Sequence, residues 1–385
     1  MNAAQVMIQI LQEISTLVIF DDNSKKVFAK TDDYYFAEPL VRLEALAKKL
    51  APKIDKHFGI QKTVGSNTTE MTKVGAALIQ TMRDIQDIYR KYDAHEFNPY
   101  VVVFMDCFKR TGMYYPEIFR SFRAIQFPDN AEEVLNRFVY DMRTRLNETE
   151  FKMIERKHRR AVKKNLAGLN HYFNGLFLHY PIMRVVRMDL TYLNACTKGY
   201  KYVRNPDSLK IVEYEEVRSH REKLIASLDS LFKGKLAGYS WTLKNSFVGG
   251  YNIHLIVFLI PSAALTQDCN EHTLNINPNE EIAIANKIGE KWLKITKDVG
   301  LFYHNMQGRN SSFRSCGTGL ARADDKRARH LLRKAADYMI KPDLYIKYVV
   351  RKDIAQSTKV PESEVKNNDR TFGKGSLPKK DKPKD

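Results

Sequence analysis

The sequence predicts an α+β protein with a helical N-terminal region over residues 1–170, a sheet domain over residues 181–355 and a basic flexible tail over residues 356–385. Three observations lead to this prediction. Apolar residues recur at three- and four-residue spacing in the first half, as along one face of a helix. Alternating apolar and polar residues appear after about residue 180. The order there is strand, helix, strand, strand, helix, strand, that of a ferredoxin-like split βαβ unit.

The N-terminal region is predicted to consist of helices and shows no residues arranged for chemistry. Its first 20 residues are apolar at helical spacing but contain glutamine and glutamate and no basic leader. They indicate a helix of the mature protein rather than a signal peptide. The full set of helices expected in this half is Met1–Phe20, Pro39–Phe58, Thr69–Tyr92, Ala131–Leu146 and Thr149–Leu166.

The sheet domain is predicted to be antiparallel, with helices on one face and an open face where a ligand would lie. The strands have period-2 patterns, and the helices have apolar residues at three- and four-residue spacing. The expected strands are Arg184–Tyr192, Gly238–Lys244, Tyr251–Ile260 and Val299–His304, and the expected helices are Val212–Phe232, Glu280–Thr296 and Asp324–Lys341. The tail beyond them is polar and rich in lysine, which favours disorder.

Composition restricts the partners. The formal net charge is +18, from 63 Lys and Arg against 45 Asp and Glu. Such an excess of positive charge favours binding to a polyanion, because each contact with a phosphate releases condensed counterions. Nucleic acid is the leading candidate. The sequence contains no apolar run of about 20 residues, so it gives no support for a membrane partner. The scattered cysteines favour reduced thiols in a cytoplasmic protein over a disulfide framework or a zinc site: Cys107, Cys196, Cys269 and Cys316.

A dense basic surface is expected on the helix over residues 149–166. A run of charge of this kind is either a solvated helix face or a phosphate-binding surface, and the sequence leaves both open. The basic residues of this helix are Lys152, Arg156, Lys157, Arg159, Arg160, Lys163 and Lys164. As DNA contacts we predict Lys157, Arg159, Arg160, Arg187, Arg333 and Lys334.

The predicted helix over residues 324–341 sets Tyr338 and Lys341 three residues apart beside an apolar face. Tyr338 falls on the seam between the apolar and cationic halves, so its ring can pack on the core while its hydroxyl meets cations. A nearby ammonium favours the phenolate and neutralises a phosphate, which suits a tyrosine that attacks a phosphodiester. The alternative is a tyrosine at the edge of an amphipathic helix.

Polar residues on two predicted strands form a candidate metal site. Alternation along the strand over residues 251–260 puts Asn252 and His254 on the same face. Alternation along the strand over residues 184–192 puts Arg187 and Asp189 on one face of that strand. If the two strands are neighbours, Asp189 and His254 meet on the open surface. With the Asn252 amide oxygen they could hold Mg²⁺ or Mn²⁺ against a scissile phosphate. The alternatives are a structural histidine and an Asp189 that pairs with Arg187.

Three segments carry a resemblance to a known family. They read RVVRMDLTY at Arg184–Tyr192, GGYNIHLIVFL at Gly249–Leu259 and DYMIK at Asp337–Lys341. In this order they resemble the three motifs of rolling-circle replication initiators of the HUH endonuclease class, in particular the inovirus and prophage family with the YagK/YfjJ C-terminal domain. The Trp292 helix and the RTFGKG stretch at Arg370–Gly375 are also similar to that family.

The resemblance implies that Tyr338 is a nucleophile that cleaves one DNA strand and keeps the 5′ phosphate as a phosphotyrosine. It implies that Lys341 orients the phosphate or the phenolate and that His254 binds the divalent cation. The class normally has a second histidine where this chain has Asn252, and an amide is a poorer metal ligand. Asp189 could supplement it, or cleavage could be lost while binding is retained.

Three functions therefore stay open. The first is a DNA replication initiator that nicks single-stranded or origin DNA with Mg²⁺ or Mn²⁺, with a host helicase as a candidate partner. The second is a non-catalytic DNA-binding or regulatory protein, in which His254 and Tyr338 are core or stacking residues. The third is a palm-type primase, which would need two acidic metal ligands close together.

Overall fold

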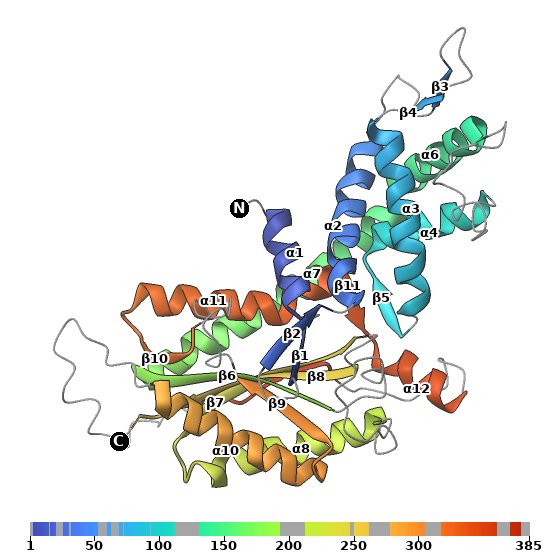
Figure 1. The fold of residues 1–385 in the computed structure, drawn as a ribbon. Coiled ribbons are helices and arrows are strands. Elements are labelled where there is room, and N and C mark those ends of the chain that lie inside the picture. Colours follow the sequence, from blue (N-terminus) through green and yellow to red (C-terminus); the bar gives the residue numbers. More distant parts are fainter. Residues whose placement is uncertain are drawn as a thin grey trace. The chain divides into compact units, whose positions relative to one another are not determined.

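The computed structural model describes residues 3–14, 16–20, 26–30, 32–52, 60–62, 69–71, 73–92, 94–111, 131–192, 212–246, 250–261, 278–304, 317–359 and 370–378. The chain divides into two compact units (Figure 1). The first unit comprises Met1–Ile14, Asp32–Val162 and Pro342–Lys347, and the second comprises Ser15–Thr31, Lys163–Lys341 and Tyr348–Asp385. The division therefore falls within one long helix, and the first unit includes a short segment that follows Lys341 in sequence.

The first unit is mainly helical, as predicted. Its core is aromatic and aliphatic, with the ring of Phe104 5.1 Å from that of Phe138 and with Leu43 and Ile88 fully buried. Asn98 caps α4 by accepting a hydrogen bond from the Tyr100 N–H, which offsets one of the unpaired amides at the helix start. The elements are α1 (Ala3–Ile14), α2 (Asp32–Leu50), β3 (Ile60–Lys62), β4 (Thr69–Met71), α3 (Lys73–Lys91), β5 (His95–Phe97), α4 (Pro99–Arg110), α6 (Ala131–Asn147), the start of α7 (Thr149–His179) and β11 (Ile346–Tyr348), which pairs with β5.

Three helix predictions in this half are partly wrong. The helix expected over Pro39–Phe58 begins at Asp32 and ends at Leu50, and residues 53–58 lie outside the described residues. The helix expected over Met1–Phe20 ends at Ile14, and Thr16–Phe20 is strand β1 instead, paired with β2 (Lys26–Lys30). The helix expected from Thr69 begins at Lys73, after strand β4. Short apolar stretches fit a helix or a strand equally well, and pairing with a second strand decides between them. Cys107 is a buried free thiol, and the other three cysteines lie outside the described residues.

The second unit contains an antiparallel sheet with the strand order β10-β6-β8-β7-β12, and β9 also pairs with β6. The four predicted strands and three predicted helices all form. The strands are β6 (Ile182–Tyr192), β7 (Leu236–Ser246), β8 (Gly250–Leu259), β9 (Gly300–His304), β10 (Gly319–Arg322) and β12 (Phe372–Lys374). The helices are α8 (Tyr214–Leu231), α10 (Pro278–Thr296), α11 (Lys326–Ile340) and the later part of α7.

Helices cover both faces of this sheet, so the prediction of helices on one face is wrong (Figure 1). On one face, Trp292 of α10 donates to the Thr191 carbonyl and Arg221 of α8 lies 4.3 Å from the Trp241 ring centroid. On the other face, the ring of Phe173 in α7 lies 5.1 Å from that of Phe258. The apolar side chains that continue on that second face require cover, and α7 extends to His179, beyond the predicted Leu166, to supply it.

The predicted flexible tail also contains regular structure. Helix α12 covers Val350–Thr358, after a 3₁₀ turn at Lys341–Leu344, and β12 adds an edge strand to the sheet through antiparallel pairing with β7. Lys374 donates to the Gly168 carbonyl. The flexible-tail prediction is therefore wrong for residues 370–378, where polar composition did not reveal an edge strand.

Candidate functional site around His254 and Tyr338

The predicted meeting of Asp189 and His254 is found in the structure. Strands β6 and β8 are antiparallel neighbours, and their register places Asp189 directly opposite His254. The Asp189 Oδ1 atom lies 2.7 Å from the His254 Nδ1 atom, within hydrogen-bond distance. The side chain of Asp189 keeps 18% of its surface exposed, whereas that of His254 keeps 3%.

Arg187 occupies the other ring nitrogen of His254. Its Nη2 atom lies 3.1 Å from His254 Nε2, and its Nε atom lies 3.3 Å away. A guanidinium can only donate, so Nε2 is the acceptor and Nδ1–H donates to Asp189. Burial is the main cause that lowers the pKa of His254. The charge and hydrogen bond of Asp189 raise this pKa, and the charge of Arg187 lowers it further. The imidazole is therefore neutral at pH 7, with both nitrogens hydrogen-bonded.

Tyr338 lies against this group. Helix α11 begins after Asp325, whose carboxylate accepts from the Arg327 and Ala328 amides. Three turns later its Tyr338 ring lies 4.9 Å from the His254 ring and 5.4 Å from the Arg187 guanidinium carbon, which is a cation–π distance. The closeness of phenol and imidazole that the sequence suggested is thus present, but Tyr338 is only 8% exposed and the expected open surface is absent here.

The remaining predicted site residues lie nearby but have other partners. The Lys341 ammonium donates to Asp337 at 2.7 Å, one helical turn earlier. Asn252 is half-buried on the same face as His254, opposite Thr191 on β6 and Lys244 on β7. Arg187 is 1% exposed, so its predicted role as a DNA contact is wrong: its position on the covered face turns it toward His254 and away from solvent.

Sequence reasoning missed two neighbours of the central pair. Tyr303 on β9 lies opposite Asp189, and Thr242 on β7 lies opposite His254, so four side chains form one row across the sheet. Burial, then the charge of Asp189, raises the pKa of Tyr303. The alternating pattern predicts which face these residues take, but nothing in it fixes the register that aligns the row.

As arranged, these residues do not fit a divalent cation. His254 has no lone pair directed to an open position, because Asp189 and Arg187 take both nitrogens. The Arg187 charge lies 3.1 Å from the nitrogen that would bind the metal, where it would repel a second cation. Among the residues that the structure describes, no three His, Cys, Asp or Glu side chains form a group that could hold a metal ion. A palm-type site, with two acidic ligands beside Asp189, finds no support in them either.

The predicted basic residues outside the sheet are in two situations. Lys157, Arg160, Arg333 and Lys334 are exposed. Arg159 is instead paired with Glu44 at 2.6 Å and with Glu155 of its own helix, which reduces its availability to a phosphate.

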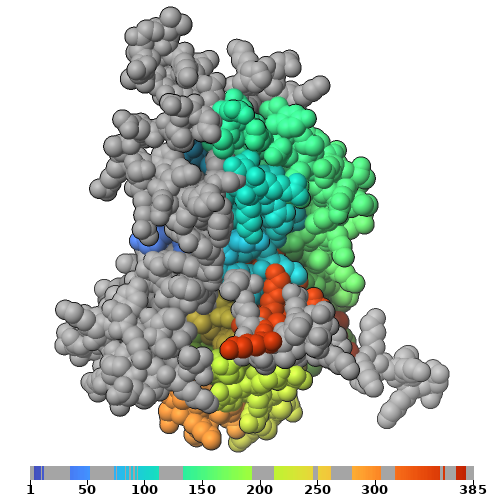
Figure 2. All heavy atoms as spheres, turned by 90° about the vertical axis from the view of Figure 1, so that its right-hand side faces the viewer, coloured from blue at the N-terminus to red at the C-terminus, as the bar shows by residue number. Residues whose placement is uncertain are grey.

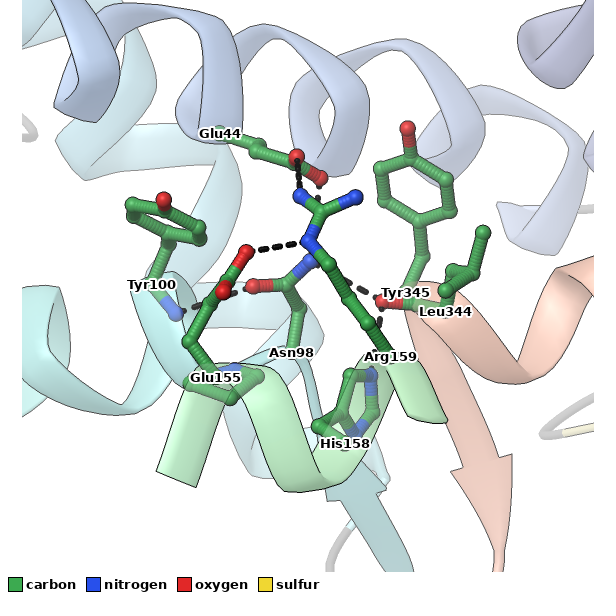
Figure 3. Close-up of a pocket in the computed structure, with 9 residues that line it drawn as sticks. Glu44, Asn98, Tyr100, Glu155, His158, Arg159, Leu344 and Tyr345 are labelled. Atoms are coloured by element: carbon green, nitrogen blue, oxygen red, sulfur yellow. Dashed lines mark hydrogen bonds and ion pairs between the residues drawn. The ribbon is translucent and has the colours of Figure 1, made fainter. Parts of the chain in front are cut away.

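The Arg159 group lines a small pocket in the first unit (Figure 3). Asn98 Nδ2 donates to Glu44 at 3.0 Å and to the Leu344 carbonyl at 2.9 Å, and His158 lies 3.1 Å from the same carbonyl. The cavity volume of about 20 Å³ is enough for one water. We assign this group a structural role, since it fixes the segment after Lys341 within the first unit.

Comparison with known proteins found no matching family model, no similar curated protein and no similar solved structure. Among the helices in the described ranges, none is long and apolar enough to cross a membrane.

Proposed function

We propose that this chain is a DNA-binding protein of the replication-initiator type, and that α7 and α11 of the second unit carry the binding surface. The observation that supports this is a set of exposed cations on two neighbouring helices. None of them forms an ion pair within the part of the chain that the structure describes. They are Lys163 and Lys164 on α7 and Lys326, Arg327, Arg333 and Lys334 on α11.

The two helices are neighbours, because Arg329 of α11 donates to Asn174 of α7 at 2.9 Å. Unpaired Lys and Arg side chains on adjacent helices would neutralise successive phosphates and release counterions from DNA. The net charge of +18 would add long-range attraction.

We further propose a ferredoxin-like connectivity for the sheet. In support of it, β9, β6, β8 and β7 are consecutive neighbours in the sheet, with β8 between β6 and β7. Each of these neighbouring pairs is antiparallel, so β6 and β7 run parallel to each other on either side of β8. A split βαβ unit would have this strand order and these strand directions.

Single-strand nicking by Tyr338 is the second candidate function, favoured by the 4.9 Å distance between the Tyr338 and His254 rings on a central strand. In the reaction the phenol oxygen would bond to phosphorus and the bond to the 3′ oxygen would break. Arg187 would first have to release the His254 Nε2 lone pair. That nitrogen could then take the phenol proton and pass it to the leaving 3′ oxygen. Because Tyr338 is 8% exposed, α11 would first have to move away from β8.

DNA binding is tested with a fluorescent single-stranded oligonucleotide pool of random sequence, by anisotropy across salt concentrations. We expect Arg333→Glu/Lys334→Glu to weaken binding by about tenfold or more and to reduce the salt slope by roughly one per lost phosphate contact. The matched control, Lys223→Glu/Lys294→Glu on α8 and α10, changes the net charge equally. Equal weakening by both pairs would contradict a surface on α7 and α11.

Nicking is tested separately with the same oligonucleotides on a denaturing gel, with and without Mn²⁺. A covalent adduct that disappears in Tyr338→Phe and persists in Tyr345→Phe supports the Tyr338 nucleophile. An adduct that survives Tyr338→Phe rules out that nucleophile. DNA binding without any adduct supports the non-catalytic alternative.

A further inference from the structure

A second surface of interest lies in the first unit. It is a groove of about 320 Å³ between α4, the end of α6 and the start of α7, with β5 at one end. In Figure 2 the teal α4 and the green α6 and α7 lie side by side on the face shown. Its lining is mainly apolar and includes the buried residues Phe97, Pro99, Val103 and Phe151.

The groove also exposes apolar side chains. Val102 on α4 is 38% exposed and Ile154 on α7 is 49% exposed, and both line it. Single exposed apolar residues are ordinary on a protein surface, but here two of them border one apolar depression. Covering them would remove apolar area from water and would favour association.

The rim of the groove is acidic although the chain as a whole is strongly basic. Four carboxylates line it against one arginine: Glu96, Asp106, Glu148 and Glu150 against Arg145. Arg145 pairs with Asp106 at 3.2 Å, and Lys347 pairs with Glu96 at 3.4 Å. Glu148 and Glu150 are exposed and form no ion pair with any residue that the structure describes.

We propose that this groove binds a basic amphipathic segment of a partner protein. Apolar side chains at helical spacing would fill the groove, and Lys or Arg beside them would pair with Glu148 and Glu150. DNA is the less suitable occupant, because its phosphates would meet four carboxylates. The proposal does not depend on the DNA-binding surface, since the residues that carry it lie on α4, α6 and the start of α7.

The probe is a labelled synthetic helix of about 18 residues, with Leu at i, i+3, i+4 and i+7 and Lys elsewhere, added to the full chain. We expect saturable anisotropy and protection of residues 99–110 and 149–158 from hydrogen exchange. Replacing Val102 and Ile154 by Asn should weaken binding by about tenfold, because the apolar contact is lost without a change of charge. Circular dichroism verifies that the variant is folded.

Charge complementarity is tested with Glu148→Lys/Glu150→Lys, which should also weaken binding by about tenfold and flatten its salt dependence. The matched control, Glu38→Lys/Glu133→Lys, reverses two exposed carboxylates outside the groove and should change affinity less than about twofold. No saturable binding, equal effects of both pairs, or protection of the groove by an oligonucleotide instead of the peptide would each overturn the proposal.

Discussion

Arg187 is a charged residue buried in the second unit. Its side chain is 1% exposed, its guanidinium bonds to His254, and the charge is compensated through His254 by Asp189. An ionised group removed from water in this way is stabilising only while its partners remain, because desolvation is costly. The face of β8 that carries His254 could be predicted from the alternation of residues along the strand. Its burial could not be predicted, because alternation gives the side on which a residue lies but not what covers that side.

Removal of Arg187 should therefore be costly. We expect Arg187→Ala to lower the free energy of unfolding by about 3–5 kcal/mol, from the cavity and from the unpaired His254 and Asp189. Urea denaturation followed by circular dichroism measures this. The matched control Arg333→Ala, an exposed arginine on α11, should change stability by less than about 0.5 kcal/mol. Similar losses in both variants would show that Arg187 is not held as described.

His254 should make the stability of the second unit depend on pH. Its neighbours are Asp189 on β6, Arg187 on β6 and Tyr338 on α11, and burial is the main reason that its pKa is lowered below the ordinary value of 6.5. The unfolded chain then binds a proton at a pH where the folded chain does not. Stability from this residue is full above pH 6.5 and decreases as pH falls from 6.5 toward the folded pKa.

The measurement is the urea midpoint between pH 7.5 and about 5. Wild type should lose more stability over this range than His254→Gln, which keeps hydrogen-bonding capacity but does not titrate. A pH profile that His254→Gln leaves unchanged would place the titrating group elsewhere.

Among the elements, β6 to β9 and their helices followed the sequence closely, because long periodic segments leave little ambiguity. The order of β6, α8, β7, β8, α10 and β9 was predicted, as was the pairing of β6 with β8. The elements missed include the helices α4 and α12 and short strands such as β5, β10 and β12, of three or four residues each. Strands of this length form through pairing with a distant strand, which a local pattern does not contain.

The packing of α10 on β9 can be tested with a pair of glycines. A Cβ at Gly289 would lie 2.4 Å from the Phe302 ring, whereas a Cβ at Gly168 in α7 would meet nothing within 4 Å. Gly289→Ala should destabilise by about 1–3 kcal/mol, because overpacking outweighs the better helix propensity of alanine. Gly168→Ala should stabilise by up to about 1 kcal/mol. Thermal unfolding measures both, and stabilisation by Gly289→Ala would contradict the close contact.

At the scale of the whole molecule, the chain does not divide where composition changes. The predicted boundary near residue 170 lies inside α7, and the two compact units separate between Val162 and Lys163. Residues 342–347 then return to the first unit, where Asn98 and His158 bond to the Leu344 carbonyl. The contact between His158 and the Leu344 carbonyl joins residues more than 180 positions apart in the sequence. Local sequence patterns carry no information on contacts between such distant residues.

This division makes a prediction about fragments. Residues 163–385 keep the part of α7 that packs on the sheet, including Phe173 against Phe258, whereas residues 181–385 lack it. The shorter fragment should expose the apolar end of that face, bind a hydrophobic dye such as ANS and unfold without a sharp thermal transition. The longer fragment should melt cooperatively with little dye binding. Equal dye binding and equal thermal transitions in the two fragments would mean that α7 is not part of the core of the second unit. In that case α11 alone would cover the face of the sheet that carries His254.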